Sequence, residues 1–420
     1  MAAKKNSGAS TKKAGKADIR VRMYRVGFGD CFLVTFGGKH HVLIDCGVHA
    51  KGNINLNGSS LIEKAFDNIR LATGDELDLI IATHAHQDHV SGFGKFADQF
   101  SKFKRIGEVW MPWTDDLSNP TAVKWHAKKK ALAAHLARAA AVRRDAAAQA
   151  AVENSSPDAK AMNALRHGFG KTKEVKYLKA GENVPTVANI AGLSARILGP
   201  PEDQGFIGKM DPPTTDHYLR MAADAAMGLE VAPFAKWEIK PNRLPKGWER
   251  VPANLITHLE QSAGFAATAA AFSLDKFLNN TSIVALFSWN GKTMLFPGDA
   301  QYGDWSSWYK KTGTDLLGNI CFYKVAHHGS WNATPKGALE EMPHNHFAAM
   351  VSTQDKPWAS IPRAALISAL DSQTGGRLMR SDSIPVPVKA PSGPKISTMN
   401  PAFTPGNYKQ GEYWVDYNVR

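Results

Sequence analysis

The stretch "LDLIIATHAHQDHVSG" (residues 77–92) joins an apolar run to a dense group of titratable side chains. The run at 77–82 is typical of a strand that is buried on both faces of a sheet. Directly after it, three histidines and one aspartate fall within six consecutive positions: His84, His86, Asp88 and His89. Four such groups at the end of one strand need a shared partner, and zinc binds imidazole nitrogen and carboxylate oxygen. The stretch therefore predicts a metal site at the end of this strand.

Three further apolar strands also end in side chains that can bind metal. "HHVLIDCG" (40–47) ends with Asp45, "KTMLFPGDA" (292–300) with Asp299, and "NICFYKVAHHGS" (319–330) with His327 and His328. Ligand sites in layered α/β proteins form where strand ends open into loops. We therefore expect these residues to converge on the histidine-rich stretch.

The spacing within the histidine-rich stretch predicts two ions. Side chains alternate along an extended backbone, so His84 and His86 point to the same side. Asp88 and His89 follow after the chain turns, so they are aimed separately and can serve a second ion. A carboxylate such as Asp299 can bridge two ions roughly 3.5–4 Å apart, and the two ions together convert a shared water to hydroxide near neutral pH.

These motifs carry a resemblance to a known family. "THAHQDHVSG" (83–92), with "LIDCG" (43–47), "FPGDA" (296–300) and "AHHGS" (326–330) in the same order, resembles the metallo-β-lactamase superfamily of metal-dependent hydrolases. "GFGDCFLV" (27–34) and "HHGS" (327–330) resemble more specifically the hydrolase domain of the DNA-uptake protein ComEC. The resemblance implies an α/β fold, a four-layer αββα sandwich with helical and irregular insertions and with the metal site at one edge of two sheets.

The resemblance also implies a ligand set, transferred by motif position. Two divalent ions, with zinc as the first choice and manganese as the alternative, would be bound by His84, His86, Asp88, His89, Asp299 and His327. Asp88, Asp299 and His328 would act in catalysis, and His328 is also the alternative to His327 as a ligand. Asp45, and with it Asp30 of the Gly-x-Gly-Asp opening, would orient ligand histidines without binding metal.

One position departs from the wider superfamily. Most members have a further histidine just before the strand that corresponds to "SIVALF" (282–287), whereas this chain has "NNTS" (279–282), with Asn280 nearest that position. The first ion would then be one ligand short. Water, Asn280, substrate, or a histidine from an insertion (His217 or His258) would complete its shell.

The composition is that of an ordinary globular protein with a basic excess. Its 420 residues carry a formal charge of +13, and its three cysteines include no CxxC pair, so neither a disulfide framework nor a thiolate zinc site is indicated. No apolar run approaches the roughly 18 residues of a membrane span. The start of the chain is rich in lysine and has no apolar segment of the kind that a secretion signal needs. We expect a cytoplasmic protein.

Part of the basic excess lies in one acid-free segment. Residues 117–144 contain seven Lys or Arg and no Asp or Glu, and six of these are candidate nucleic-acid contacts: Lys128, Lys129, Lys130, Arg138, Arg143 and Arg144. Such cations displace counterions from a phosphate backbone; the alternative is simply a solvated helix face. Aromatic and basic residues also alternate at 234–250, where they would stack on bases or merely pack in a loop.

The pattern of elements predicts one domain with extensions. The expected parts are a disordered basic tail at 1–18, a metallo-β-lactamase-fold domain at 19–383 with a basic helical insertion at about 113–174 and an irregular one at about 201–275, and an extension at 384–420 that wraps the surface. Locally, we expect strands at 19–27, 31–38, 40–47 and 106–112, a helix at 59–73 capped by Ser59 or Ser60, one long helix at 121–149, and a hairpin around Asn290 and Gly291.

The residues thus favour a metal-dependent hydrolase, and specifically a phosphodiesterase or nuclease that uses a metal-bridged hydroxide on nucleic acid or a nucleotide. The alternative is a small-molecule hydrolase of the same fold, of the lactonase, thioesterase, phosphocholine esterase or β-lactamase type. A non-catalytic metal-binding module is disfavoured, because a decaying site would have lost some of its ligands.

Overall fold

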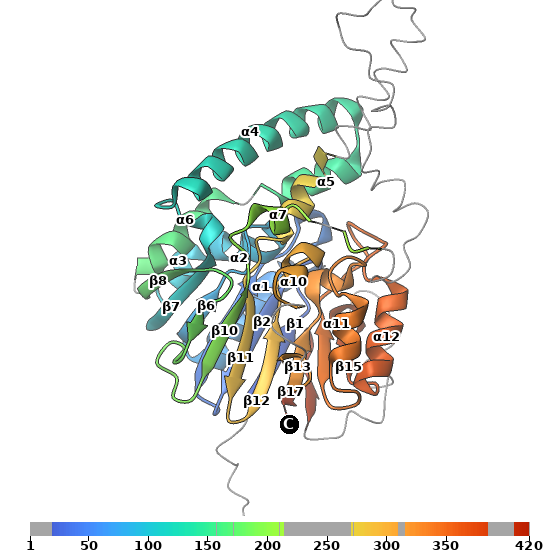
Figure 1. Ribbon diagram of the computed structural model, residues 1–420. Coiled ribbons are helices and arrows are strands. Elements are labelled where there is room, and N and C mark those ends of the chain that lie inside the picture. The colour runs from blue at the N-terminus through green and yellow to red at the C-terminus, as the bar shows by residue number, and fades with distance from the viewer. Residues whose placement is uncertain are drawn as a thin grey trace, which may run out of the picture.

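Two β-sheets stacked face to face form the centre of the computed structural model, and helices cover the outer face of each (Figure 1). The structure describes residues 19–156, 158–170, 172–209, 211–213, 270–271, 273–309, 316–384 and 407–419. The mixed α/β architecture agrees with the metallo-β-lactamase fold and with the four-layer αββα sandwich that the sequence predicts.

The first sheet is mixed, with the strand order β16-β17-β1-β2-β3-β6-β7-β8. Its strands are β1 (Ile19–Tyr24), β2 (Cys31–Phe36), β3 (His40–Cys46), β6 (Glu76–Ile81), β7 (Arg105–Pro112), β8 (Thr172–Leu178), β16 (Tyr408–Gln410) and β17 (Trp414–Val419). β3, β6, β7 and β8 run parallel. The carboxyl ends of β3 and β6 therefore lie at the same edge of the sheet.

The second sheet has the order β15-β14-β13-β12-β11-β10-β9. Its strands are β9 (Asn183–Val184), β10 (Ser194–Gly199), β11 (Val284–Trp289), β12 (Lys292–Phe296), β13 (Ile320–Lys324), β14 (Ala348–Val351) and β15 (Leu378–Arg380). β12 to β15 run parallel, so the loops after β12 and β13 also open at one edge. A short ladder of β4 (Asn55–Leu56) and β5 (Ser59–Ser60) stands apart from both sheets.

The helices form the outer layers and the two insertions. Against the first sheet lie α1 (Leu61–Thr73), α2 (Gln87–Lys95), α3 (Ala97–Phe100) and α6 (Ala159–His167); with the second sheet are α10 (Tyr302–Trp308), α11 (Lys336–Glu341) and α12 (Ala364–Thr374). The insertions also contain α4 (Pro120–Arg143), α5 (Ala146–Asn154) and α7 (Gln204–Ile207). Short 3₁₀ turns are η1 (Ala50–Gly52), η2 (Trp113–Asp115), η3 (Gly168–Gly170), η7 (Ala326–Gly329) and η8 (Ser381–Ser383).

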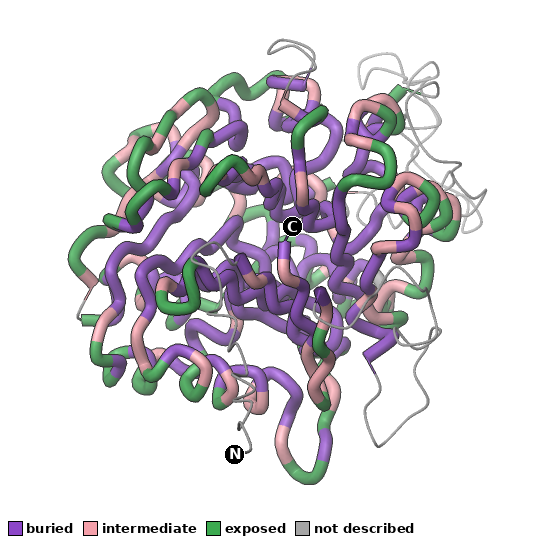
Figure 2. The backbone as a smooth tube through the Cα atoms, turned by 90° about the horizontal axis from the view of Figure 1, so that it is seen from below, coloured by how far each residue is buried: buried purple, intermediate pink, exposed green. Residues whose placement is uncertain are grey.

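Alternation along each strand explains the near-continuous apolar runs. On β6, Leu79 and Ile81 face the core between the sheets, whereas Ile80 packs under the helices. A strand covered on both faces needs apolar side chains at odd and even positions alike. Buried residues accordingly fill the middle of the backbone trace, and exposed residues lie at its periphery (Figure 2).

The start of α1 and the turn between β11 and β12 follow the local sequence. Ser60 caps α1 through a capping box, in which its backbone N–H donates to the Glu63 carboxylate at 2.7 Å. Asn290 and Gly291 adopt φ values of 49° and 76°, as a type I′ turn requires. Both predictions are confirmed.

Two predictions are wrong. The expected single helix at 121–149 is two helices, because Arg144 adopts a left-handed φ of 54° after α4 and α5 begins at Ala146. The C-terminal extension does not simply wrap the surface, because its β17 pairs with β1 and extends the first sheet. The basic tail at 1–18, the stretch 234–250, and His217 and His258 lie outside the described residues.

In the described part of the chain, no helix is both long enough and apolar enough to cross a bilayer.

A buried ion pair joins the two ends of the described chain. The Arg22 guanidinium on β1 donates to both carboxylate oxygens of Asp416 on β17, at 2.6 and 2.8 Å. It also lies over the ring of Trp414, with its central carbon 3.7 Å from the ring centroid. Arg22 and Asp416 are 7% and 3% exposed, so neither charge can rely on water if the other is lost.

We expect Asp416→Ala to lower the free energy of unfolding by about 3–5 kcal/mol, because the Arg22 charge would stay buried without its partner. Chemical denaturation of the full-length protein measures this change. Arg70→Ala, which breaks the exposed pair between Arg70 and Asp75, is the control and should lower stability by less than about 1 kcal/mol. Equal effects of the two substitutions would contradict the prediction.

Candidate metal centre

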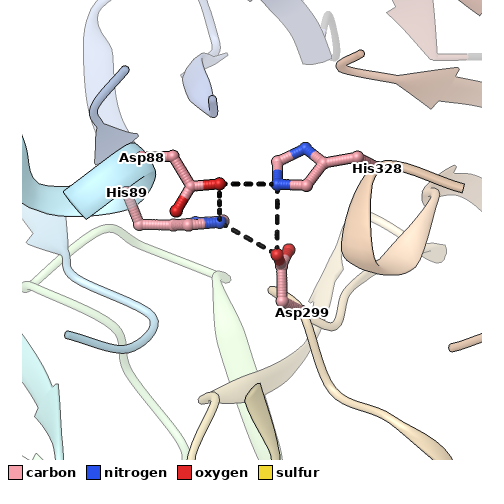
Figure 3. A group of neighbouring side chains, drawn as sticks. All are labelled: Asp88, His89, Asp299 and His328. Carbon is pink, nitrogen blue, oxygen red and sulfur yellow. Dashed lines mark hydrogen bonds and ion pairs between the residues drawn. The ribbon is translucent and has the colours of Figure 1, made fainter. Parts of the chain in front are cut away.

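Four buried side chains converge from three loops at the shared edge of the sheets (Figure 3). Asp88 and His89 lie in the first turn of α2, directly after β6, while Asp299 follows β12 and His328 lies in η7 after β13. We call these four residues the tetrad. Each is at most 1% exposed. The parallel strands explain the convergence, since their carboxyl ends open at one edge.

The donor atoms of the tetrad form a closed ring. Asp88 Oδ2 lies 3.0 Å from His328 Nε2 and 3.8 Å from His89 Nε2. Asp299 Oδ2 lies 3.1 Å from each of the same two nitrogens.

This ring fits a divalent ion. A tetrahedral shell with bonds of about 2.0–2.2 Å holds its donors roughly 3.3–3.6 Å apart, close to the spacing found here. Asp88 Oδ1 is buried and has no hydrogen-bond partner among the described residues. The ring atom His89 Nε2 is also buried without a hydrogen-bond partner among these residues. Buried polar atoms are nearly always paired, so unpaired atoms on two residues of the tetrad indicate a cation site.

A second set of donors lies beside the tetrad. His84 Nε2 and His86 Nδ1 face each other at 2.9 Å, and the ring centroids of His84 and His89 are 4.2 Å apart. The other nitrogen of His84, Nδ1, lies 3.1 Å from the Thr83 hydroxyl. The facing nitrogens of this histidine pair can serve a second ion, as the spacing of the motif predicts.

Asp45 lies behind His89, as expected for an orienting residue. Its Oδ2 lies 2.8 Å from His89 Nδ1 and accepts the Thr83 hydroxyl at 2.7 Å, and its Oδ1 accepts the Thr83 backbone N–H at 2.8 Å. This arrangement fixes the ring so that Nε2 faces the tetrad.

Asp30 lies behind the centre together with a lysine that the sequence analysis missed. The Lys324 ammonium is 2.5 Å from Asp30 Oδ2 and 3.1 Å from Asp299 Oδ1, and it donates to the Gly298 carbonyl at 2.8 Å. Lys324 is only 2% exposed. A lysine at the end of the apolar run "ICFYK" was the available signal, because a charge at a buried position needs a partner.

Three histidines of the centre are held neutral. Burial, followed by the charges of His89 and His86, lowers the pKa of His84. Burial lowers the pKa of His86 to about 3 and that of His327 to about 4. Neutral imidazole is the form that binds metal, so His84 and His86 are ready to do so across the physiological pH range.

The two tetrad histidines behave in the opposite way. Burial opposes their charge, but Asp299 and Asp30 outweigh it at His328 and raise its pKa to about 10. Asp299 and Asp88 likewise raise the pKa of His89. Burial would also raise the pKa of the two carboxyls, yet the imidazoles hold the pKa of Asp88 and Asp299 below its usual range. In the absence of a metal, the neighbouring carboxylates therefore favour the protonated form of His89 and His328.

The structure places His328, and not His327, in the tetrad. Asn279 and Gln301 lie 3.3 Å from Nε2 and Nδ1 of His327, respectively. His328 Nδ1 lies 2.9 Å from the Ser352 carbonyl oxygen, which leaves Nε2 for the centre. The geometry thus favours His328 as the ligand, the alternative that the sequence left open.

Asn280 does not face the histidine pair. Its Nδ2 donates to the Ile207 carbonyl at 2.9 Å, and its Oδ1 accepts the Gln301 N–H at 3.0 Å. Both ends of its amide are occupied by backbone groups, so the expectation that Asn280 supports the first ion is corrected. Its neighbour Asn279 points toward His327 instead.

Two further residues were missed because they come from the insertions. Asp275 Oδ1 lies 3.6 Å from His86 Nε2, and burial, followed by the charge of Asp88, raises the pKa of its carboxyl to about 8. Asn154, the last residue of α5, accepts the Asp88 N–H at 3.3 Å. No local pattern could have identified either residue, since each sits in a segment that resembles an ordinary helix.

The basic residues of α4 lie on its solvent side. Ala133, Leu136 and Ala140 pack against α5 and residues 271 and 274. The exposed cations are Lys124, Lys128, Lys130, Arg138 and, just after the helix, Arg144. Lys129 is an exception, because it is partly buried and lines a small cavity with Asp115 and His126. The side chain of Arg143 lies outside the described residues.

Comparison with known proteins found one matching family model and similar solved structures. Residues 24–136 match the family model of the metallo-beta-lactamase superfamily, a span that includes Asp45 and the stretch from His84 to His89. Among solved structures, the chain is similar to the metallo-beta-lactamase fold protein YhfI from Bacillus subtilis, with 8% identity, a TM-score of 0.35, and coverage of 86% of this chain and 96% of that chain. The comparison with curated proteins found no match. The superfamily match, together with the buried cluster of histidines and aspartates, indicates a metal-dependent hydrolase.

Matched substitutions separate the two adjacent histidines of η7. His327 and His328 both adopt left-handed φ values, 47° and 52°, which asparagine tolerates better than most residues. We expect His328→Asn to weaken the binding of one zinc ion by at least about 100-fold, through the loss of one ligand of the tetrad. His327→Asn should change zinc affinity less than threefold. Competition with a chromophoric chelator measures both, and the reverse ranking would assign the ligand to His327.

Zinc binding to the tetrad should release protons from His89 and His328, because only a neutral imidazole offers its lone pair. The pKa of both is raised, so the metal-free protein holds these protons at neutral pH and the apparent affinity must increase with pH. Between pH 6 and 8 we expect an increase of about 100-fold per pH unit, since two protons are released. Calorimetry in buffers of different ionisation enthalpy counts the protons; a count of zero would contradict the assignment.

Proposed function

We propose that the protein is a metal-dependent phosphodiesterase that cleaves nucleic acid or a nucleotide, with two divalent ions, zinc in the first instance and manganese as the alternative. The observation that carries the proposal is the meeting of the two ComEC-like motifs behind the tetrad. Asp30, from "GFGD", lies 3.5 Å from Nδ1 of His328, from "HHGS". The backbone N–H of Asp30 also donates to the Asp88 carbonyl at 3.0 Å.

The roles of the residues follow from their positions. Asp88, His89, Asp299 and His328 would hold one ion, and His84 and His86 would hold the other, with Asp299 between them. Bound divalent ions would supply Lewis-acid chemistry and a water nucleophile at neutral pH.

The surrounding residues keep these donors in place. Asp45 holds the ring of His89, while Lys324 neutralises Asp299 from behind and thus directs its Oδ2 toward the tetrad. His327, anchored between Asn279 and Gln301, lies beside His328 and can contact a phosphoryl oxygen of the substrate.

The solvent face of α4 supports a polyanionic substrate. Lys124, Lys128 and Arg138 are exposed, and no Asp or Glu occurs in α4. Cations on such a surface hold a phosphate backbone by releasing its counterions. They do not line the tetrad, however, because α4 packs its opposite face toward the protein. The second candidate is a small-molecule hydrolase, in which these cations would have no part in binding the substrate.

The test combines a nuclease assay with substitutions on α4. We expect zinc- or manganese-loaded protein to cleave labelled single- or double-stranded DNA or RNA, and also bis-p-nitrophenyl phosphate. In the triple variant Lys124→Ala/Lys128→Ala/Arg138→Ala, the plot of log binding constant against log salt concentration should become less steep by about 2.7, because each lost phosphate contact removes about 0.9 from the slope. Turnover of the small ester should not change. The control Lys39→Ala/Lys102→Ala/Lys336→Ala removes exposed lysines elsewhere and should behave as wild type.

One combination of results would contradict the proposed phosphodiesterase activity on nucleic acid. If no polynucleotide is cleaved with zinc, manganese or magnesium at low salt, while a lactone, thioester or small phosphodiester is turned over, the protein is a small-molecule hydrolase.

A further inference from the structure

One nitrogen of the histidine pair is left without a hydrogen bond. His86 Nδ1 faces His84 Nε2 at 2.9 Å, but His86 Nε2 is buried and has no hydrogen-bond partner among the described residues. Asp275 Oδ1 lies 3.6 Å from this nitrogen. Asp275 is 9% exposed and lies in the helical segment 273–279, which leads back from the second insertion into β11.

This contact determines which nitrogen of His86 carries the proton. A neutral ring carries its proton on one nitrogen and its lone pair on the other. A carboxylate beside Nε2 favours the proton there and thereby leaves the lone pair on Nδ1. In this structure the oxygen beside Nε2 is Asp275 Oδ1, and the atom that faces His84 is Nδ1.

Asn154 holds the Asp275 carboxylate in place. Its Nδ2 donates to Asp275 Oδ1 at 3.4 Å, and its Oδ1 accepts the Asp88 N–H at 3.3 Å. One amide from the first insertion thus connects a carboxylate of the second insertion to the backbone of a tetrad residue. Both insertions therefore contribute residues to the metal centre.

We propose that Asp275 is a positioning residue for His86: it accepts the Nε2–H of the ring and so presents Nδ1 as a donor to the ion shared with His84. The inference rests on the proposed assignment of His84 and His86 to one ion, but not on the identity of the substrate. The contact matters more here than in relatives that have a further histidine, because "NNTS" (279–282) offers no imidazole to this ion.

The test measures the zinc affinities of the full-length protein by chelator competition. Asp275→Ala should lower the affinity for one of the two zinc ions by about 10- to 100-fold, as the loss of a carboxylate partner behind a ligand histidine does. The affinity for the other ion should change less than threefold. Asp275→Asn should recover most of this loss, because Asn154 still donates to the side-chain oxygen and keeps it beside Nε2.

A control and a spectroscopic readout distinguish positioning from folding. Asp211→Asn removes a carboxylate that pairs with Lys276 on the same helical segment but does not face His86, and it should bind zinc as wild type does. In ¹⁵N-histidine spectra of the zinc-loaded protein, one ring with its proton on Nε2 and metal on Nδ1 should be present in wild type and lost in Asp275→Ala.

The outcomes are separable. Unchanged affinity for both ions in Asp275→Ala overturns the inference and leaves the proposed function standing. If the wild-type protein binds only one zinc ion, the two-ion assignment fails and the inference fails with it. Equal losses in Asp275→Ala and Asp211→Asn would show that Asp275 acts only by holding the helical segment, which also overturns it.

Discussion

A concentration of buried negative charge at the shared edge of the two sheets is the constraint on which the rest of the structure depends. Asp30, Asp45, Asp88 and Asp299 are each at most 1% exposed. Carboxylates removed from water are strongly destabilising unless cations and hydrogen bonds compensate them. In the metal-free protein, that compensation comes from the Lys324 ammonium and from the protons on the two tetrad histidines. Bound divalent ions would replace these protons as the positive charge that compensates the carboxylates.

The fold explains why so much charge can be gathered there. Parallel strands in both sheets bring the loops after β3, β6, β12 and β13 to one edge, and the apolar faces of the strands are fully used in three packed layers of side chains. The edge is therefore free to carry polar groups without weakening the core. Behind the donors, Asp45 and Lys324 fix the orientation of His89 and Asp299, so contacts behind the tetrad preorganise the centre.

Residues of both insertions lie next to the same centre. α5 ends with Asn154, which reaches the backbone of Asp88, and the helical segment 273–279 places Asp275 beside His86. The basic face of α4 is turned outward, where it can meet a large anion before that anion reaches the centre. The described parts of the insertions thus contribute some residues to the centre and present others to solvent.

The sequence by itself determined the elements and the core of the centre. Apolar runs placed the strands, and Ser60 and the Asn290–Gly291 pair placed a helix start and a turn, because these signals act between neighbours along the chain. The order of the strand-end motifs carried the resemblance to a superfamily of metal-dependent hydrolases.

Only the tertiary structure decided the contacts between distant segments. Local periodicity carries no information about which remote side chain will meet a given atom, so Lys324 against Asp30, Asp275 against His86, and the choice of His328 over His327 emerged from the packing. The same holds for β17. The alternation in "WVDYNV" (414–419) is typical of a strand, but its pairing with β1, across which Arg22 contacts Asp416, joins segments that are distant in the sequence.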